Sequence, residues 1–225
     1  MKRETTEKMY ARAAGRYDRR LEFWFGRVLR IEGWRERAVE ALGPLTGRTV
    51  LDVGCGTGAN LPLLVQRVGP EGRVIGVDTT PEMLELARER VRRSGWTNVD
   101  LRRGDAVTLD AVNERVDAVL STYCLGIVSD LDATLRRISS VLEPGGRLAI
   151  LDFPRTRPDS GPVRLLHPIY SALLQAWGIT SAEDLDDEAQ RRKWNQARKV
   201  LNEVFTDVRE KPFLWGLFML LTARR

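Results

Sequence analysis

The stretch that decides the fold is Val50-Leu51-Asp52-Val53-Gly54-Cys55-Gly56-Thr57-Gly58, in which a short apolar segment runs directly into three alternating glycines. Glycine is needed where a chain turns sharply or where its backbone lies directly against a ligand. At the carboxyl end of a parallel strand, such a turn forms the floor of a nucleotide-like site. Asp78 follows Gly58 by 20 positions, at the expected end of the next strand, where a carboxylate accepts hydrogen bonds from ribose hydroxyls.

Short apolar segments alternate with amphipathic segments after this turn. Strands are predicted at 49–53, 74–77, 99–101, 116–120 and 147–151, and helices at 59–68, 81–93 and 131–142. Thr80 is expected to cap the second of these helices, and Pro81 to occupy its first position. Pro144-Gly145-Gly146 is expected to stop the third. This alternation predicts an α/β fold with a doubly wound, mostly parallel sheet covered on both faces.

Three flanking regions depart from the alternation. Residues 1–42 are predicted to form an N-terminal helical segment, separate from a domain at 43–225. Residues 154–202 are predicted to be a helical insertion after the fifth strand. The segments 205–213 and 217–222 are expected to form an antiparallel C-terminal hairpin at the edge of a seven-stranded sheet.

Composition excludes several classes of protein. The 225 residues are 43% hydrophobic, enough for one domain with a substantial core. Cys55 and Cys124 form neither a disulfide framework nor a zinc pattern, so we expect a reducing cytoplasm, small packing roles for both thiols, and no metal. The longest apolar run, at 213–221, has nine residues, whereas a membrane-spanning helix needs about 20.

The net charge of +5 arises mainly near the N-terminus, where residues 1–40 hold eleven Lys/Arg and seven Asp/Glu. One interpretation is a solvated basic helix face. The other is contact with an anionic surface such as phospholipid headgroups, into which Trp24 and Phe25 would insert. Nucleic acid is not expected as a partner, because the aromatic residues are not interleaved with basic residues in a nucleic-acid-binding motif.

The glycine turn alone fits NAD, FAD or S-adenosyl-L-methionine (SAM). Ala59 stands where the dinucleotide pattern Gly-x-Gly-x-x-Gly has its last glycine, so spacing does not exclude NAD. Gly104-Asp105-Ala106 follows the third predicted strand. There a carboxylate could accept the adenine amino group, and the small Ala106 leaves space for the ring.

Five segments stand in the order and spacing of one family. They are LDVGCGTG at 51–58, VIGVDTTPEML at 74–84, GDA at 104–106, VDAVLSTY at 116–123 and LEPGGRLAILDF at 142–153. With these segments the chain resembles the class I SAM-dependent methyltransferases over about residues 48–153. The resemblance implies a Rossmann-like methyltransferase fold, SAM as cofactor and S-adenosyl-L-homocysteine as product. The cofactor-binding residues that it implies are Tyr17, Asp52, Gly54, Cys55, Gly56, Gly58, Asn60, Asp78, Thr79, Met83, Gly104, Asp105, Ala106 and Ser121.

A narrower resemblance involves the N-terminal segment. Ala13-Ala14-Gly15-Arg16-Tyr17-Asp18 and the helix with Trp34-Arg35 look like the start of the ubiquinone/menaquinone methyltransferases. Bacterial phosphatidylethanolamine N-methyltransferases share this layout. In these families the tyrosine touches the cofactor, which implies that role for Tyr17. The quinone enzymes' signature after the fifth strand is only loosely present at 154–177.

Methyl transfer from SAM is an in-line displacement with a neutral leaving group. The enzyme must therefore align the acceptor and exclude water, and it needs no acid for the leaving group. An amine or phenol acceptor must also lose a proton. Candidates for this catalytic role are His167, Tyr123 and Tyr170, and only the histidine has an ordinary pKa near neutrality.

The leading hypothesis is a cytoplasmic SAM-dependent methyltransferase, peripheral at the inner membrane face, that acts on an amphipathic or lipid-like acceptor such as a phospholipid amine or a quinone/phenol. The alternative is a soluble small-molecule amine, phenol or natural-product intermediate. A SAM-binding protein without turnover and a nicotinamide oxidoreductase belong to other functional classes, and binding measurements with SAM and NAD would separate them.

Overall fold

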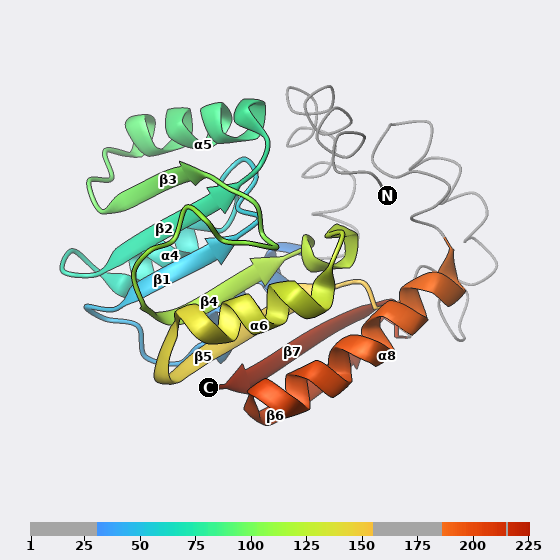
Figure 1. The fold of residues 1–225 in the computed structure, drawn as a ribbon. Helices are drawn as coiled ribbons and strands as arrows, with labels where there is room; N and C mark the ends of the chain where they lie inside the picture. Colours follow the sequence, from blue (N-terminus) through green and yellow to red (C-terminus); the bar gives the residue numbers. More distant parts are fainter. Residues whose placement is uncertain (1–30, 155–185, 215) are drawn as a thin grey trace.

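The computed structural model describes residues 31–154, 186–214 and 216–225. Seven strands there form one sheet in the order β3-β2-β1-β4-β5-β7-β6 (Figure 1). They are β1 (Thr49–Val53), β2 (Arg73–Asp78), β3 (Val99–Arg103), β4 (Val116–Thr122), β5 (Leu142–Asp152), β6 (Thr206–Phe213) and β7 (Phe218–Arg224). β1 to β5 pair in parallel, whereas β7 pairs antiparallel with both β5 and β6. The predicted doubly wound sheet and C-terminal hairpin are confirmed.

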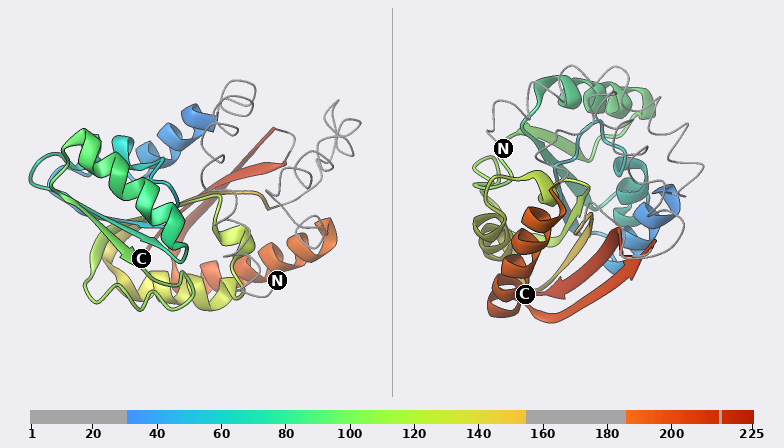
Figure 2. Two further views of the ribbon diagram at one scale, coloured as in Figure 1. Left: turned by 90° about the horizontal axis from the view of Figure 1, so that it is seen from above. Right: turned by 90° about the vertical axis from the view of Figure 1, so that its right-hand side faces the viewer.

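Helices cover both faces of the sheet. They are α3 (Ile31–Ala41), α4 (Leu61–Val68), α5 (Pro81–Ser94), α6 (Leu131–Val141) and α8 (Asp187–Val204), with a short 3₁₀ helix, η2 (Leu125–Ile127). Successive residues of a strand point to opposite faces. Accordingly, Val50 packs in the cluster that includes α3 and α4, whereas Leu51 packs in the cluster that includes α6 and α8. These two pairs of helices lie on opposite faces of the sheet (Figure 2).

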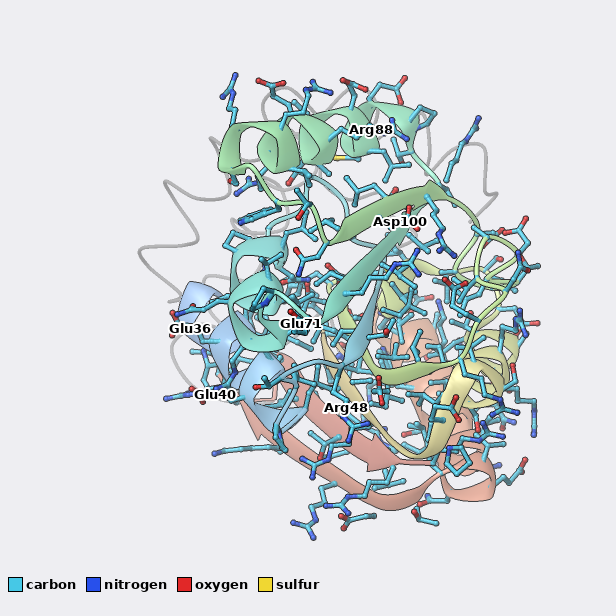
Figure 3. All side chains as sticks on the ribbon, turned by 90° about the vertical axis from the view of Figure 1, so that its left-hand side faces the viewer. Glu36, Glu40, Arg48, Glu71, Arg88 and Asp100 are labelled. Carbon is cyan, nitrogen blue, oxygen red and sulfur yellow. The ribbon has the colours of Figure 1, made fainter. Side chains whose placement is uncertain are left out.

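The solvent-facing sides of these helices are polar. Glu36 and Glu40 lie exposed on the outer surface of α3 (Figure 3), opposite the buried Ala38 and Val39. None of the described helices is long and apolar enough to cross a bilayer.

The order of the strands reverses between β1 and β4. β1 pairs with β2 on one side and with β4 on the other, so the loops that leave their carboxyl ends diverge. Such a switch point leaves a crevice at the carboxyl edge of the sheet, where open α/β folds bind their ligands. The glycine turn at 54–58 lies at this switch point.

Two local predictions were wrong. β5 begins at Leu142, which pairs with Val116, and the next paired residue, Arg147, faces Ala118. The intervening Pro-Gly-Gly segment is therefore a bulge within the strand rather than the stop of α6. Thr80 stands at the N-cap position of α5 and Pro81 follows it, as predicted, but the Thr80 side chain forms no capping bond; its backbone N–H donates to the Asp78 carboxylate at 2.9 Å.

The region predicted as a helical insertion, 154–202, is described only from residue 186. Its helix α8 packs against α6 and contributes Trp194, Ala197, Val200 and Leu201 to the core of the sheet. α3 likewise shares a core cluster with β1. The parallel strands β1 to β5, here called the parallel unit, are therefore buried in part by α3, which precedes them in the chain, and by α8, which follows them.

Trp194 provides a test of how much α8 contributes to stability. Its side chain is fully buried, and its indole N–H has no hydrogen-bond partner among the described residues. We expect Trp194→Ala to lower the free energy of unfolding by about 3–5 kcal/mol through the cavity it leaves. Trp194→Phe keeps a ring and removes the unpaired donor, so its loss is expected to be about 2 kcal/mol smaller. Urea unfolding measures both, and equal losses below about 1 kcal/mol would show that α8 is not part of the cooperative core.

Candidate active site

The loop after β1 is tied to the end of β2 by backbone hydrogen bonds. The N–H groups of Gly54 and Cys55 donate to the carbonyl of Val77 at 2.8 and 3.1 Å, and Gly58 N–H donates to the carbonyl of Cys55 at 2.9 Å. This loop therefore has a fixed shape at the carboxyl edge of the sheet.

The three glycines of the loop are required for different reasons. All have positive φ, at 71°, 53° and 79°, a region that other residues adopt only with strain. A Cβ at Gly54 would lie 2.2 Å from Cys124 Sγ, and one at Gly58 would lie 2.6 Å from Leu61 Cδ1. A Cβ at Gly56 would meet nothing within 4 Å. Gly54 and Gly58 thus allow close packing within the protein, whereas Gly56 leaves an open stretch of backbone that a ligand can approach.

Asp78 connects this loop to the loop after β2. Its Oδ2 accepts the Gly56 N–H at 2.9 Å, and its Oδ1 accepts the Thr80 N–H at 2.9 Å. Burial raises the pKa of the carboxyl, and the donated N–H groups oppose that rise. The result is an oriented, partly exposed carboxylate at the position where a ribose hydroxyl donates in nucleotide-like sites.

The segment after β3 lies beside Asp78. Gly104 N–H donates to the Asp78 carbonyl at 3.1 Å, and Asp105 Oδ1 accepts the Val107 N–H at 2.9 Å. Ala106 is buried in the core next to them. The loops after β1, β2 and β3 therefore meet at one edge, as the sequence predicted.

These loops fit the adenosine part of SAM. An added Cβ at Gly56 would meet no atom within 4 Å, so the backbone is open to a ligand at this point. Backbone N–H groups orient the carboxylates of Asp78 and Asp105, whose roles as acceptors for the ribose and the adenine remain predictions. When bound, SAM supplies a methyl group activated by its sulfonium.

A buried polar network underlies the loop. Asp52 is fully buried and accepts both of its hydrogen bonds from Asn60 Nδ2, at 3.0 and 3.2 Å. The same amide contacts Thr122 Oγ1 at 3.0 Å. These contacts join the end of β1 to the start of α4 and to the end of β4, on both sides of the loop. Burial raises the pKa of Asp52 to about 7, against the opposing effects of Asn60 and Arg35.

Tyr123 lies directly after β4. Its φ is 57°, and its N–H donates to the Leu151 carbonyl at 2.8 Å. The guanidinium carbon of Arg35, on α3, lies 5.3 Å from the centre of the Tyr123 ring. This is a cation–π contact, and it brings a cation beside the carboxyl ends of β1 and β4. The sequence points to Arg35 only through the N-terminal resemblance.

Five aromatic side chains, here called the aromatic row, extend away from this point. Successive ring centres are separated by 5.3 Å for Tyr123–Phe153, 4.4 Å for Phe153–Phe218, 5.2 Å for Phe218–Phe213 and 3.4 Å for Phe213–Trp34. The row joins the ends of β4 and β5 to the C-terminal hairpin and α3. Sequence reasoning missed it, because its members come from five separate segments.

A second group that sequence reasoning missed lies at the end of β5. The buried Asp152 accepts N–H groups from Gly126 and Phe153 at 2.9 and 2.8 Å. Lys193 Nζ donates to the carbonyls of Gly126 and Val128 at 2.8 and 2.6 Å. These contacts fix the loop that follows Tyr123 against α8.

The predicted cofactor residues fall into three groups. The loop edge holds Gly54, Gly56, Gly58, Asp78, Thr79, Gly104 and Asp105, with Asn60 and Asp52 directly beneath. Ser121, Met83, Ala106 and Cys55 lie in the packed interior. Ser121 Oγ donates to the Val53 carbonyl at 2.9 Å, so its hydroxyl is used within the sheet. The predicted Tyr17, His167 and Tyr170 lie outside the described residues.

The two thiols fill space, as predicted. Cys55 Sγ would lie 3.0 Å from a Cβ at Gly76, and Cys124 packs against Gly54. Burial raises the pKa of both thiols above its ordinary value, which disfavours the reactive thiolate.

The contrast between Gly54 and Gly56 can be tested with two variants. Gly56→Ala is expected to fold, with a free energy of unfolding about 1–2 kcal/mol lower because of its positive φ. It is expected to weaken S-adenosylhomocysteine binding at least tenfold, because the added methyl group occupies the open side of the backbone that the ligand approaches. Gly54→Ala adds a clash with Cys124, so its loss of stability should exceed that of Gly56→Ala. Urea unfolding and calorimetric titration measure the two quantities. Unchanged binding in Gly56→Ala would show that the ligand does not approach there.

The raised pKa of Asp52 predicts a pH-dependent stability. Between about pH 4 and pH 7 the folded protein holds a proton on Asp52 that the unfolded chain releases, so stability falls as pH rises through this window and levels off above it. Asp52→Asn removes this dependence. Relative to that variant, the wild type should lose on the order of 3 kcal/mol from pH 4 to pH 8. If the free energies of unfolding of the wild type and of Asp52→Asn changed in parallel with pH, the raised pKa of Asp52 would be contradicted.

Comparison with known proteins identifies the family. A family model described as a methyltransferase domain matches residues 45–204. The demethylmenaquinone methyltransferase of Tropheryma whipplei is 38% identical and covers 75% of this chain. The ubiquinone/menaquinone biosynthesis C-methyltransferase UbiE of Vibrio campbellii is 32% identical over 80% of this chain. A SAM-dependent methyltransferase structure from Aquifex aeolicus superimposes with a TM-score of 0.59 at 23% identity, covering 84% of this chain and 88% of that one.

The chain is shorter than these curated relatives. It spans 64% of the Tropheryma protein and 68% of the Vibrio protein. An arsenite methyltransferase of Halobacterium salinarum is 40% identical over 57% of this chain, which spans 32% of that protein. The family-model match covers most of this chain, including all of the loops described above. The chain belongs to the class I SAM-dependent methyltransferases, and it is related to those of the quinone type.

Proposed function

We propose that this enzyme transfers the SAM methyl group to a ring carbon of a quinol-type acceptor that carries an apolar tail. The observation that carries the proposal is the aromatic row, which leads from Tyr123, beside the cofactor loops, to Trp34 on α3. The names of two relatives, a demethylmenaquinone methyltransferase and a quinone C-methyltransferase, support the same class of acceptor.

The aromatic row suits a planar ring with a hydrocarbon tail. Aromatic side chains bind such rings by offset stacking or edge contacts, worth about 0.5–1.5 kcal/mol per pair beyond area burial. Phe153 is only partly buried, whereas its neighbour Phe218 is 1% exposed and supports it from the core. A partly exposed ring on a rigid base is suited to contact an acceptor.

The chain's own residues position the reactants and exclude water. The Gly54–Gly58 loop and Asp78 hold the adenosine end of the cofactor, and the polar network of Asp52, Asn60 and Thr122 keeps that loop in place. Aromatic side chains exclude water from the acceptor side. Alignment and desolvation are the main requirements of this displacement, whose leaving group is neutral.

Peripheral contact with the inner membrane face remains a prediction, as does a cytoplasmic location. It depends on Trp24 and Phe25, which lie outside the described residues. A phospholipid amine and a soluble small molecule remain alternative acceptors.

A competition among acceptors tests the proposal. The wild type is given radiolabelled SAM with a reduced demethylated prenyl-naphthoquinone, phosphatidylethanolamine vesicles or a soluble catechol. We expect label in the quinol, attached through carbon and resistant to acid hydrolysis. Label confined to the phospholipid amine or to a catechol oxygen would contradict the proposal.

Phe153 tests the aromatic row. We expect Phe153→Ala to raise KM for the prenylated quinol about tenfold, equivalent to about 1.4 kcal/mol, because it removes a stacking surface. Its affinity for S-adenosylhomocysteine should change less than twofold. Leu86→Ala, at an exposed apolar residue on α5, is the matched control and should leave both values unchanged. An unchanged KM in Phe153→Ala would remove the row from the acceptor site.

A further inference from the structure

Arg35 has a buried donor without a partner. Its Nε is inaccessible to solvent and forms no hydrogen bond, and no ion pair joins its guanidinium to any carboxylate of the described residues. A buried donor that stays unpaired costs about 1–3 kcal/mol, and more when it carries charge. The described residues thus supply no acceptor for this Nε and no carboxylate for the guanidinium, which is therefore suited to bind an anionic ligand.

The place of Arg35 suggests what that partner is. The guanidinium lies over the Tyr123 ring, at the end of the aromatic row that adjoins the cofactor loops. Asp52 is close enough for the cation to oppose the rise of its pKa, but the hydrogen bonds of that carboxylate come from Asn60. The positive charge of Arg35 is therefore not neutralised by a direct contact with Asp52.

We infer that Arg35 binds an oxyanion in the active site, the ionised hydroxyl of the acceptor. This inference rests on the proposed quinol acceptor and names the residue that recognises it. A guanidinium offers five N–H donors in one plane, stays charged at any working pH, and stacks on aromatic rings. With its central carbon 5.3 Å from the centre of the Tyr123 ring, it can direct donors toward an oxygen on an acceptor ring that contacts the aromatic row.

The chemistry explains why an anion is useful at this point. The acceptor hydroxyl first releases its proton to solvent water, which places negative charge on oxygen and on the adjacent ring carbon. An electron pair of that carbon forms the new C–C bond while the C–S bond breaks and its pair passes to sulfur. The ring carbon then releases its proton to water, and the aromatic ring is restored. Arg35 stabilises the oxyanion from which this sequence starts.

The cofactor carries another oxyanion, the carboxylate of its methionine part. The cation–π contact with Tyr123, whose ring contacts Phe153 and Phe218, places Arg35 on the side proposed for the acceptor. The acceptor oxyanion and the cofactor carboxylate predict different effects of removing the Arg35 charge, and the experiment below separates them.

The test uses 4-nitrophenol, whose absorbance reports its ionisation, as an unreactive acceptor probe in the presence of S-adenosylhomocysteine. We expect the wild type to bind the phenolate and lower the apparent pKa of the probe by about one unit, a tenfold preference for the anion. Arg35→Gln should abolish this shift, and Arg35→Lys should keep part of it. Arg67→Gln removes a charge from the exposed last turn of α4 and should behave as the wild type.

Binding and turnover complete the test. In Arg35→Gln we expect less than a threefold change in S-adenosylhomocysteine affinity and about a 100-fold lower kcat with the quinol. An equal probe shift in wild type and Arg35→Gln would overturn the inference. So would a tenfold loss of S-adenosylhomocysteine affinity with unchanged affinity for 5′-methylthioadenosine, because that result assigns Arg35 to the cofactor carboxylate.

The inference and the proposed function can fail separately. If the wild type ionises 4-nitrophenol through Arg35 but methylates no quinol, the anion site stands and the acceptor class is wrong. If it methylates the quinol and Arg35→Gln does so equally well, the acceptor class stands and the role of Arg35 is wrong. Arg35→Lys guards against misfolding of the neutral variant, since it retains the charge; thermal melting of each variant verifies the fold.

Discussion

The carboxylate of Asp78 is the contact on which the cofactor side of the site depends. One oxygen holds the Gly56 N–H from the loop after β1, and the other holds the Thr80 N–H at the start of α5. Two loops that diverge from neighbouring strands are thereby fixed to each other through one side chain. The burial that accompanies this position raises the pKa of Asp78, and the two backbone donors compensate part of the cost of keeping a charge there.

The rest of the site follows from the switch point in the sheet. Because β1 lies between β2 and β4, the cofactor loops gather on one side of it and Tyr123 on the other. The hydrogen-bonded network of Asp52, Asn60 and Thr122 links the two sides beneath the loop. On the side proposed for the acceptor, α3 supplies Arg35 and Trp34 and the C-terminal hairpin supplies Phe213. In this proposal, elements outside the parallel unit complete the site.

Local features of the sequence were enough to predict the parallel unit and the cofactor loops. The glycine spacing, Asp78 after an apolar strand, and the Gly104-Asp105-Ala106 turn are each short-range patterns whose geometry depends on a few neighbouring residues. Local reasoning placed Thr80 correctly at the N-cap of α5 but was wrong about its capping bond, since the hydroxyl accepts no N–H of the first turn and Thr80 instead donates its own N–H to Asp78. It was also wrong at the Pro-Gly-Gly segment, because pairing of Leu142 with Val116 extends β5 through it. The contacts of Trp34 with Phe213 and of Arg35 with Tyr123 join distant parts of the chain. The hydrophobic periodicity of single segments cannot predict such pairs.

The most direct test of the cofactor site is a calorimetric comparison of two ligands, S-adenosylhomocysteine and its 2′-deoxy analogue. Each ligand is titrated into the wild type and into Asp78→Asn. If Asp78 accepts a ribose hydroxyl, the wild type binds the 2′-deoxy analogue about 10–100-fold more weakly, as expected for a hydrogen bond to a charged group. Asp78→Asn then binds both ligands with the same reduced affinity. Equal binding of the two ligands by the wild type, or unchanged binding of S-adenosylhomocysteine by Asp78→Asn, would contradict the account.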